Sequence, residues 1–100
     1  MPATTMLELS TGHLPETERD LLNQTTETDP DFPVRLIHHE YGWLLPVPSD
    51  RDDLDRAYRH LLRAGAPAFA LTVVYAAGAG ARFLYFDLDA DPDPNLPWYS

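Results

Sequence analysis

Residues 49–65, SDRDDLDRAYRHLLRAG in one-letter code, form the stretch that decides the fold class of this chain. Its apolar residues recur at the i, i+3, i+4, i+7 and i+8 spacing of one buried helical face, at Leu54, Ala57, Tyr58, Leu61 and Leu62. Ser49 or Asp50 can cap the first turn, and Gly65 fits the position just beyond the last turn. We therefore predict an amphipathic helix from Asp50 to Ala64, as the main layer over a sheet.

Segments with strand propensity lie on both sides of this helix. They cover residues 6–9, 34–40, 41–47 and 82–88, and a further helix is expected from Pro15 to about Gln24. Pro46 places its strand at a sheet edge, because proline cannot donate to a ladder. The pattern predicts an α+β fold in a single domain, residues 1–100: a small mixed sheet of three or four strands with two or three helices packed on one face.

Residues 66–80 fit two patterns at once. The stretch from Phe69 to Tyr75 has strand propensity. Pro67 nevertheless fits the start of a helix, and Gly78 and Gly80 fit its end. The residues by themselves leave helix and strand open here.

The chain is strongly acidic. Sixteen aspartates and glutamates face seven arginines, there is no lysine, and the net charge is −9. Such a charge repels phosphates, which argues against direct nucleic-acid binding and favours a basic protein surface as partner. A purely solubilising role for the charge is the alternative.

Composition also excludes several classes of protein. There is no cysteine, which removes disulfides, thiol catalysis and the common zinc-finger layouts. No apolar stretch approaches the about 20 residues of a membrane helix, and Met1 to Leu9 lack the pattern of a signal peptide. We expect a cytoplasmic protein with no membrane partner and no cofactor.

The aspartates concentrate in two blocks, residues 50–55 and 87–93. Asp52 and Asp55 have arginines at i,i+4, whereas the second block has only Arg82 nearby in sequence. If the strand continued through the second block, its alternate carboxylates would all point one way. The candidate partner-binding carboxylates are Asp50, Asp53, Asp87, Asp89, Asp91 and Asp93.

Two chemical interpretations of the second block are weak. A calcium loop starting at Asp87 or Asp89 lacks the glycine at position six and the glutamate at position twelve. A phosphatase nucleophile needs further motifs downstream, and only eleven residues follow Asp89.

Tyr41 and Trp43 flank a predicted hairpin turn at Gly42. Either can belong to the core. An exposed one would anchor an interface, since aromatic side chains dominate interface energetics.

A third polar set, Ser10, Thr11 and His13, precedes the first helix. A serine beside a histidine allows a hydrolase interpretation, although the chain lacks a Gly-x-Ser-x-Gly elbow. The alternative is that Ser10 or Thr11 bonds the backbone of a turn and that His13 packs or bonds locally. His38 and His39 point to opposite faces of a strand, so no metal site is predicted.

Four short motifs follow one another along the chain: Ser10-Thr11-Gly12-His13-Leu14, Tyr41-Gly42-Trp43, Leu84-Tyr85-Phe86-Asp87-Leu88-Asp89 and Leu96-Pro97-Trp98-Tyr99. In this order they resemble a family of small uncharacterised bacterial proteins that plasmids, integrative elements and phages commonly carry. The resemblance implies a helix at Pro67 to Ala79. Ala90 stands where members of that family often have glycine.

Charge, clustered aspartates and the lack of an assembled catalytic set favour a non-enzymatic protein that binds a basic surface of a protein or nucleoprotein complex. Spaced carboxylates can imitate a phosphate backbone, so the hypothesis is a mobile-element inhibitor or adaptor of a host defence complex, of the anti-CRISPR or anti-restriction type. The alternatives are a small hydrolase or metal-dependent enzyme, using Ser10 and His13 or the Asp87–Asp93 run, and a structural or immunity-like accessory domain.

Overall fold

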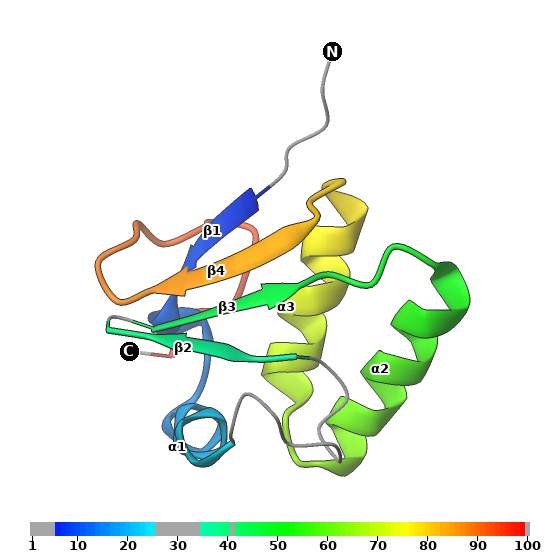
Figure 1. The fold of residues 1–100 in the computed structure, drawn as a ribbon. Helices are drawn as coiled ribbons and strands as arrows, with labels where there is room; N and C mark the ends of the chain where they lie inside the picture. Colours follow the sequence, from blue (N-terminus) through cyan, green and yellow to red (C-terminus); the bar gives the residue numbers. More distant parts are fainter. Residues whose placement is uncertain (1–5, 26–34, 41, 100) are drawn as a thin grey trace.

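The computed structural model describes residues 6–25, 35–40 and 42–99 of the chain. The strands are β1 Met6–Ser10, β2 Ile37–His39, β3 Gly42–Pro46 and β4 Phe83–Asp87. The helices are α1 Glu16–Gln24, α2 Arg51–Arg63 and α3 Pro67–Gly78, and η1 is a 3-10 turn at Thr11–His13. The four strands form one mixed sheet in the order β1-β4-β3-β2, with α3 behind it, α2 beside α3 and α1 near β2, as Figure 1 shows. The predicted α+β class is confirmed.

Alternation along the strands gives the sheet a buried face and an open face. β1 runs parallel to β4, and the other neighbours are antiparallel. Leu9, Phe86 and Trp43 are in register across β1, β4 and β3, and all three are buried. Two residues away along β4 and β3, Leu84 and Leu45 form a second buried pair. Because side chains alternate along a strand, the residues between them face away from the helices.

Pro46 does not mark a sheet edge as predicted, because β3 lies between β4 and β2. The N–H of Val47 donates to the Arg82 carbonyl at 2.8 Å, on the β4 side. The nitrogen of Pro46 therefore faces the β2 side, where pairing stops at Ile37 with Leu44. Because β2 is short, no β2 residue pairs with Pro46, and the missing N–H of proline costs the sheet no hydrogen bond.

The predicted hairpin between β2 and β3 is present, but both strands are shorter than the predicted segments. Gly42 begins β3 directly beside β4. A Cβ at this position would lie 1.9 Å from the carbonyl oxygen of Phe86. Glycine is therefore required here for the close approach of the two backbones.

The stretch at 49–65 forms the predicted helix, α2. Asp50 rather than Ser49 is the cap, because its Oδ1 accepts from the N–H of Asp52 at 3.0 Å. Gly65 follows the helix with a φ of 86°, a conformation that glycine adopts without strain. The ambiguous segment is helical, as the family resemblance implied.

The helix that covers the sheet is α3 rather than α2. α3 contacts β4 and η1, and α2 packs on α3. Phe69 and Val73 of α3 are buried, and the Phe69 ring centroid lies 5.8 Å from that of Phe86. The prediction that α2 is the main layer over the sheet was wrong. A helix with one apolar stripe can bury only one side, whereas the largely apolar α3 can be buried between the sheet and α2.

The N-terminus of α3 is capped by a side chain from α1. Ala66, which precedes α3, has no side-chain oxygen, so the first N–H groups of the helix need another acceptor. Glu18 supplies it: Oε1 accepts from the N–H of Phe69 at 2.7 Å, and Oε2 accepts from the N–H of Ala68 at 3.1 Å. Glu18 is only 3% exposed. The helix dipole favours a carboxylate at this position.

Substituting Glu18 tests this cap. In Glu18→Gln the amide can accept from one N–H group but turns its own NH2 toward the other. The free energy of unfolding should fall by about 1–3 kcal/mol, measured by urea denaturation. Glu16→Gln removes an exposed acid from the same turn and should change stability by less than about 0.5 kcal/mol. Equal losses in the two variants would contradict the assignment.

Candidate functional site

The Ser10–His13 motif holds the C-terminal segment, residues 88–99, against the fold. His13 is 2% exposed, and its Nε2 accepts from the N–H of Asp93 at 2.8 Å. Its Nδ1 lies 2.8 Å from the Pro97 carbonyl oxygen, so Nδ1 carries the proton. These partners are 80 and 84 residues distant in sequence, in contrast to the local contacts expected for His13. We call this arrangement of His13 with the C-terminal segment the latch.

Trp98 closes the latch over Gly12. Its ring meets the His13 ring edge-on, with centroids 5.4 Å apart. A Cβ on Gly12 would lie 2.3 Å from the Trp98 ring, so the motif needs glycine here. The N–H of Tyr99 donates to the Gly12 carbonyl at 2.8 Å, and Ser10 Oγ accepts from the Gly12 N–H at 3.1 Å.

This geometry argues against the hydrolase alternative. Both ring nitrogens of His13 are engaged by backbone groups, so neither is free to take a proton from a nucleophile. Ser10 and Thr11 are 2% and 5% exposed. These three residues therefore build a turn and its contacts with the C-terminal segment.

Removing the latch should free the C-terminal segment. In His13→Ala we expect the amide protons of Asp93 and Tyr99 to exchange at least about tenfold faster, because two hydrogen bonds are lost. Hydrogen exchange followed by NMR measures the effect. His60→Ala, an exposed position on α2, is the control. Unchanged protection in His13→Ala would show that other contacts hold the segment.

Asp93 belongs to the latch and is not the unpaired carboxylate that its sequence position predicted. Its Oδ2 accepts from the Tyr75 hydroxyl of α3 at 2.9 Å, and its Oδ1 accepts from the N–H of Asn95 at 2.9 Å. The side-chain amide of Asn95 donates to the same Tyr75 oxygen at 3.3 Å. The carboxylate of Asp93 thus ties the C-terminal segment to α3.

The remaining aspartates of the second block do not share one strand face. β4 ends at Asp87, whose Oδ1 accepts from the N–H of Asp89 at 3.0 Å in a tight turn. Asp89 and Asp91 are exposed, and neither has an ion pair within the part of the chain that the structure describes. The strand stops at the first of them, so the condition under which all four carboxylates would point one way is not met.

The first block is partly neutralised, although one ion pair differs from the predicted one. Arg59 contacts Asp55 at 3.2 Å, as expected. Arg56 contacts Asp53 at 3.4 Å instead of Asp52. Both pairs are exposed and therefore weak. α2 together with its cap contains four aspartates and four arginines, so its formal charges balance.

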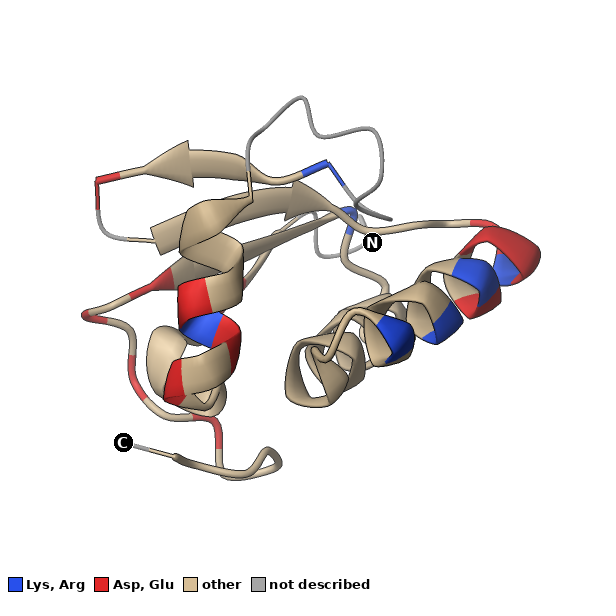
Figure 2. Cartoon of the chain, turned by 90° about the horizontal axis from the view of Figure 1, so that it is seen from below, with Lys and Arg blue, Asp and Glu red and all other residues tan. Residues whose placement is uncertain are grey.

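Charge is thus divided between two sides of the molecule. Figure 2 shows the acidic residues of α1, with Arg19 among them, and those of the segment after β4 on one side, and the mixed charges of α2 on the other. We call the first group the acidic edge: Glu16, Asp20, Asp87, Asp89 and Asp91. Arg82, which is close to this block in sequence, precedes β4 and lies at the opposite end of that strand.

The predicted aromatic anchors are not both available. Trp43 is 4% exposed and packs edge-on against Phe86, so it is a core residue. Tyr41 lies outside the described residues. The exposed aromatic side chains in the described ranges are Phe83, Trp98 and Tyr99.

Tyr85 lies on the open sheet face, and two nearby carboxylates, Asp87 and Glu8, affect its ionisation. The His39 ring stacks on it with centroids 4.5 Å apart. Burial, followed by the negative charges of Asp87 and Glu8, raises the pKa of Tyr85 above its ordinary value of 10.0. A raised pKa in the folded state favours the neutral hydroxyl. The resulting stability is present below pH 10 and is lost as the pH rises through the raised pKa.

Neutralising the two carboxylates should lower the pKa of Tyr85 toward 10.0. The variant is Glu8→Gln/Asp87→Asn, and NMR titration of the Tyr85 ring signals is the measurement. Asp52→Asn/Asp53→Asn on α2 removes the same charge elsewhere and should leave the pKa of Tyr85 unchanged. The same pKa in the wild type and in the first variant would mean that the carboxylates do not act on Tyr85.

The histidines of the β2–β3 hairpin are engaged by backbone groups. His38 Nε2 lies 2.5 Å from the Thr25 carbonyl oxygen, and His39 Nε2 lies 3.2 Å from that of Phe86. Among the described residues, no three side chains of histidine, aspartate or glutamate come together as ligands for a metal ion. None of the described helices has the length and apolar character to cross a membrane.

Comparison with known proteins places the chain in a family. Residues 6–100 match the Family of unknown function (DUF5983) C-terminal domain. The chain belongs to this family. The match spans every described strand and helix, including the latch and the acidic edge. No curated protein and no solved structure matches the chain.

Two latch residues were missed by sequence reasoning, Tyr75 and Trp98. Tyr75 carries a hydroxyl in an otherwise largely apolar helix, and such a group needs a hydrogen-bond partner. Trp98 follows a proline-rich stretch in which no regular element is expected. The hydroxyl of Tyr75 and the position of Trp98 do not identify their partners, Asp93 and His13, because these residues are far away in sequence.

Proposed function

We propose that this domain is a non-enzymatic binding protein that docks its acidic edge on a basic surface of a protein or nucleoprotein complex. The observation that carries the proposal is the separation of charge. Five carboxylates of the acidic edge accompany a single arginine of α1, Arg19, whereas four arginines balance the four aspartates of α2 and its cap. The latch holds the backbone on the C-terminal side of these carboxylates, so they keep their positions relative to α1 and β4.

A group of carboxylates held in this way acts mainly on the rate of association. Complementary charge steers the encounter with a basic surface and raises the association rate more than the final affinity. The effect falls with ionic strength, because the screening length in physiological salt is about 8 Å. A partner should therefore be captured at low salt and released as salt increases.

The finer proposal is that the partner is a nucleoprotein defence complex and that the carboxylates stand in for a phosphate backbone. The net charge of −9 and the resemblance to proteins of mobile elements support this version. On this proposal the domain inhibits or adapts a host restriction or CRISPR-type complex and has no contact with nucleic acid itself.

Neutralising the acidic edge tests the binding proposal. Asp87→Asn/Asp89→Asn/Asp91→Asn removes three negative charges, and asparagine at 87 can still accept the turn hydrogen bond. We expect capture of a partner from host lysate at low salt to fall at least about tenfold, and its salt dependence to flatten. Asp93 is left unchanged because its carboxylate holds the latch.

The matched control is Asp52→Asn/Asp53→Asn/Asp55→Asn, which removes three charges from α2. The control should capture the partner as the wild type does. Equal capture by all three proteins would overturn the role of the acidic edge. The finer proposal is tested by the plating efficiency of phage on a host that carries a restriction or CRISPR system. Expression of the wild type, but not of the edge variant, should raise that efficiency.

A further inference from the structure

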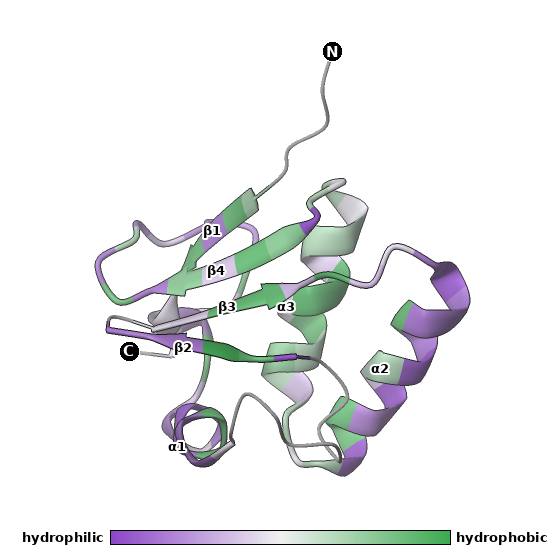
Figure 3. Cartoon of the chain, in the orientation of Figure 1, coloured by the Kyte–Doolittle hydropathy of each residue, from purple (hydrophilic) through white to green (hydrophobic). Residues whose placement is uncertain are grey.

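α3 has an apolar face that no described element covers. The sequence Pro67–Gly78 contains no charged residue, and Figure 3 shows α3 in pale to green colours along most of its length. A helix that is apolar on all sides is typical of complete burial. Leu71 and Val74 nevertheless are 44% and 37% exposed. Thr72, in contrast, is buried, and its hydroxyl donates to the Phe69 carbonyl at 2.7 Å.

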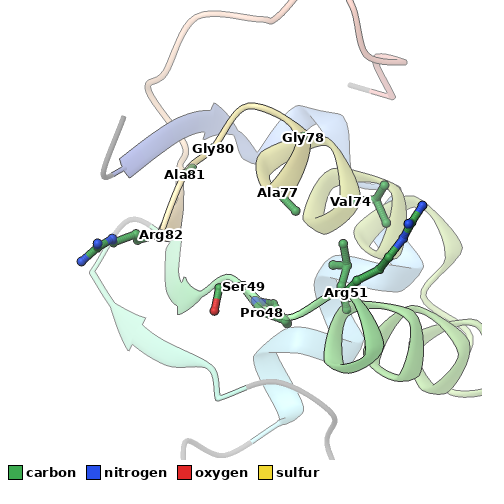
Figure 4. A pocket seen from close by; sticks show the side chains of 10 residues that line it. Pro48, Ser49, Arg51, Val74, Ala77, Gly78, Gly80, Ala81 and Arg82 are labelled. Atoms are coloured by element: carbon green, nitrogen blue, oxygen red, sulfur yellow. The ribbon is translucent and has the colours of Figure 1, made fainter. Parts of the chain in front are cut away.

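These exposed residues form one wall of a groove between α2 and α3. The groove has a volume of about 330 Å³ and is lined by six side chains: Arg51, Leu54, Asp55, Tyr58, Leu71 and Val74. Near Val74 it continues into a hollow of about 580 Å³ that extends to Ala77 and Ala81, as Figure 4 shows. Leu71 and Val74 are three residues apart and therefore share one face of α3, so the groove has a continuous apolar wall.

The groove carries one charge of each sign. Arg51 has no ion pair within the described part of the chain, and it is the first residue of α2, where the helix dipole disfavours a cation. Asp55 lies one turn further along the same helix and is exposed, and its Oδ2 contacts Arg59 at 3.2 Å. α2 has balanced charges in an otherwise acidic chain. Two copies can therefore approach each other at this surface with less repulsion than at the acidic edge.

We propose that the groove is the interface of a two-fold symmetric dimer, occupied by the same groove of a second copy of this chain. In a two-fold contact one surface meets itself in the opposite direction. Leu71 and Val74 of each copy then pack against the apolar wall of the other. Arg51 of each copy meets Asp55 of the other, which adds a second arginine to the carboxylate that Arg59 already contacts, and the symmetry makes this contact twice.

The arrangement packs α2 and α3 of both copies as four helices around a shared apolar layer. It covers the exposed face of α3, which nothing in the described chain covers. The acidic edge belongs to other elements, α1 and the end of β4, and remains open on both copies. The dimer is therefore independent of the proposed function, and either can fail without the other.

Sedimentation equilibrium tests the dimer. The wild type should reach the mass of two chains as its concentration rises from about 10 μM to about 1 mM, the range in which a specific dimer of moderate affinity forms. Leu71→Glu/Val74→Glu should weaken association by at least about 100-fold, because it places four carboxylates in the paired grooves. Both residues are exposed, so the monomer should keep its fold, which circular dichroism can establish.

The matched control is Met6→Glu/Phe83→Glu. These two apolar residues are 46% and 40% exposed and lie in register on the open sheet face. The control variant should dimerise as the wild type does. A wild type that stays monomeric over the whole range would overturn the proposal. So would a dimer that the control variant loses and the groove variant keeps.

A charge exchange tests the two-fold pairing itself. Arg51→Glu and Asp55→Arg should each dimerise at least about tenfold more weakly, because symmetry places like charges together twice. An equimolar mixture of the two variants should form a heterodimer, since each contact again joins opposite charges. Native mass spectrometry distinguishes this heterodimer from the homodimers. A mixture that associates no better than its components would overturn the pairing of Arg51 with Asp55.

Discussion

The buried carboxylate of Glu18, bonded to the first N–H groups of α3, is the contact on which the rest of the structure depends. α3 is the inner helix, with the sheet on one side and α2 on the other. It begins after Ala66, which cannot cap it, so its position is set by a side chain from α1. A carboxylate removed from water needs both hydrogen bonds, and α1 and α3 can shift only together.

α3 also organises the C-terminal segment at its other end. Tyr75 binds the carboxylate of Asp93, and His13 binds the backbone on either side of it, at Asp93 and Pro97. The segment contains no helix or strand of its own. Its course is therefore determined by side chains of η1 and α3. This is how exposed carboxylates at the start of an irregular segment acquire fixed positions.

The distribution of charge and apolar area gives the molecule two different surfaces. One is the acidic edge, where carboxylates outnumber arginines and like charges of a second copy would be repelled. The other is the α2–α3 groove, where charges balance and apolar side chains are exposed. The first surface suits a partner of opposite charge, and the second suits a partner of the same kind. A dimer formed through the groove would present two acidic edges to one large complex, which multiplies the effective affinity.

Local patterns in the sequence determined most of the secondary structure. The apolar spacing from Leu54 to Leu62 and the cap at Asp50 were sufficient to predict α2, because both signals act within one or two helical turns. The order of the layers did not follow from them. A strong amphipathic pattern identifies a helix but not its depth, so α2 was placed where α3 lies.

The candidate site was predicted by composition but not by geometry. The charge of −9 and the two aspartate blocks are visible in the sequence, but the arginines of α2 balance the first block. Only the tertiary structure showed that Asp93 is bonded to Tyr75, that Trp43 is buried and that Glu18 caps α3. These contacts join residues from different elements. A single sequence specifies which side chains need partners, but the packing of the elements decides which partners they find.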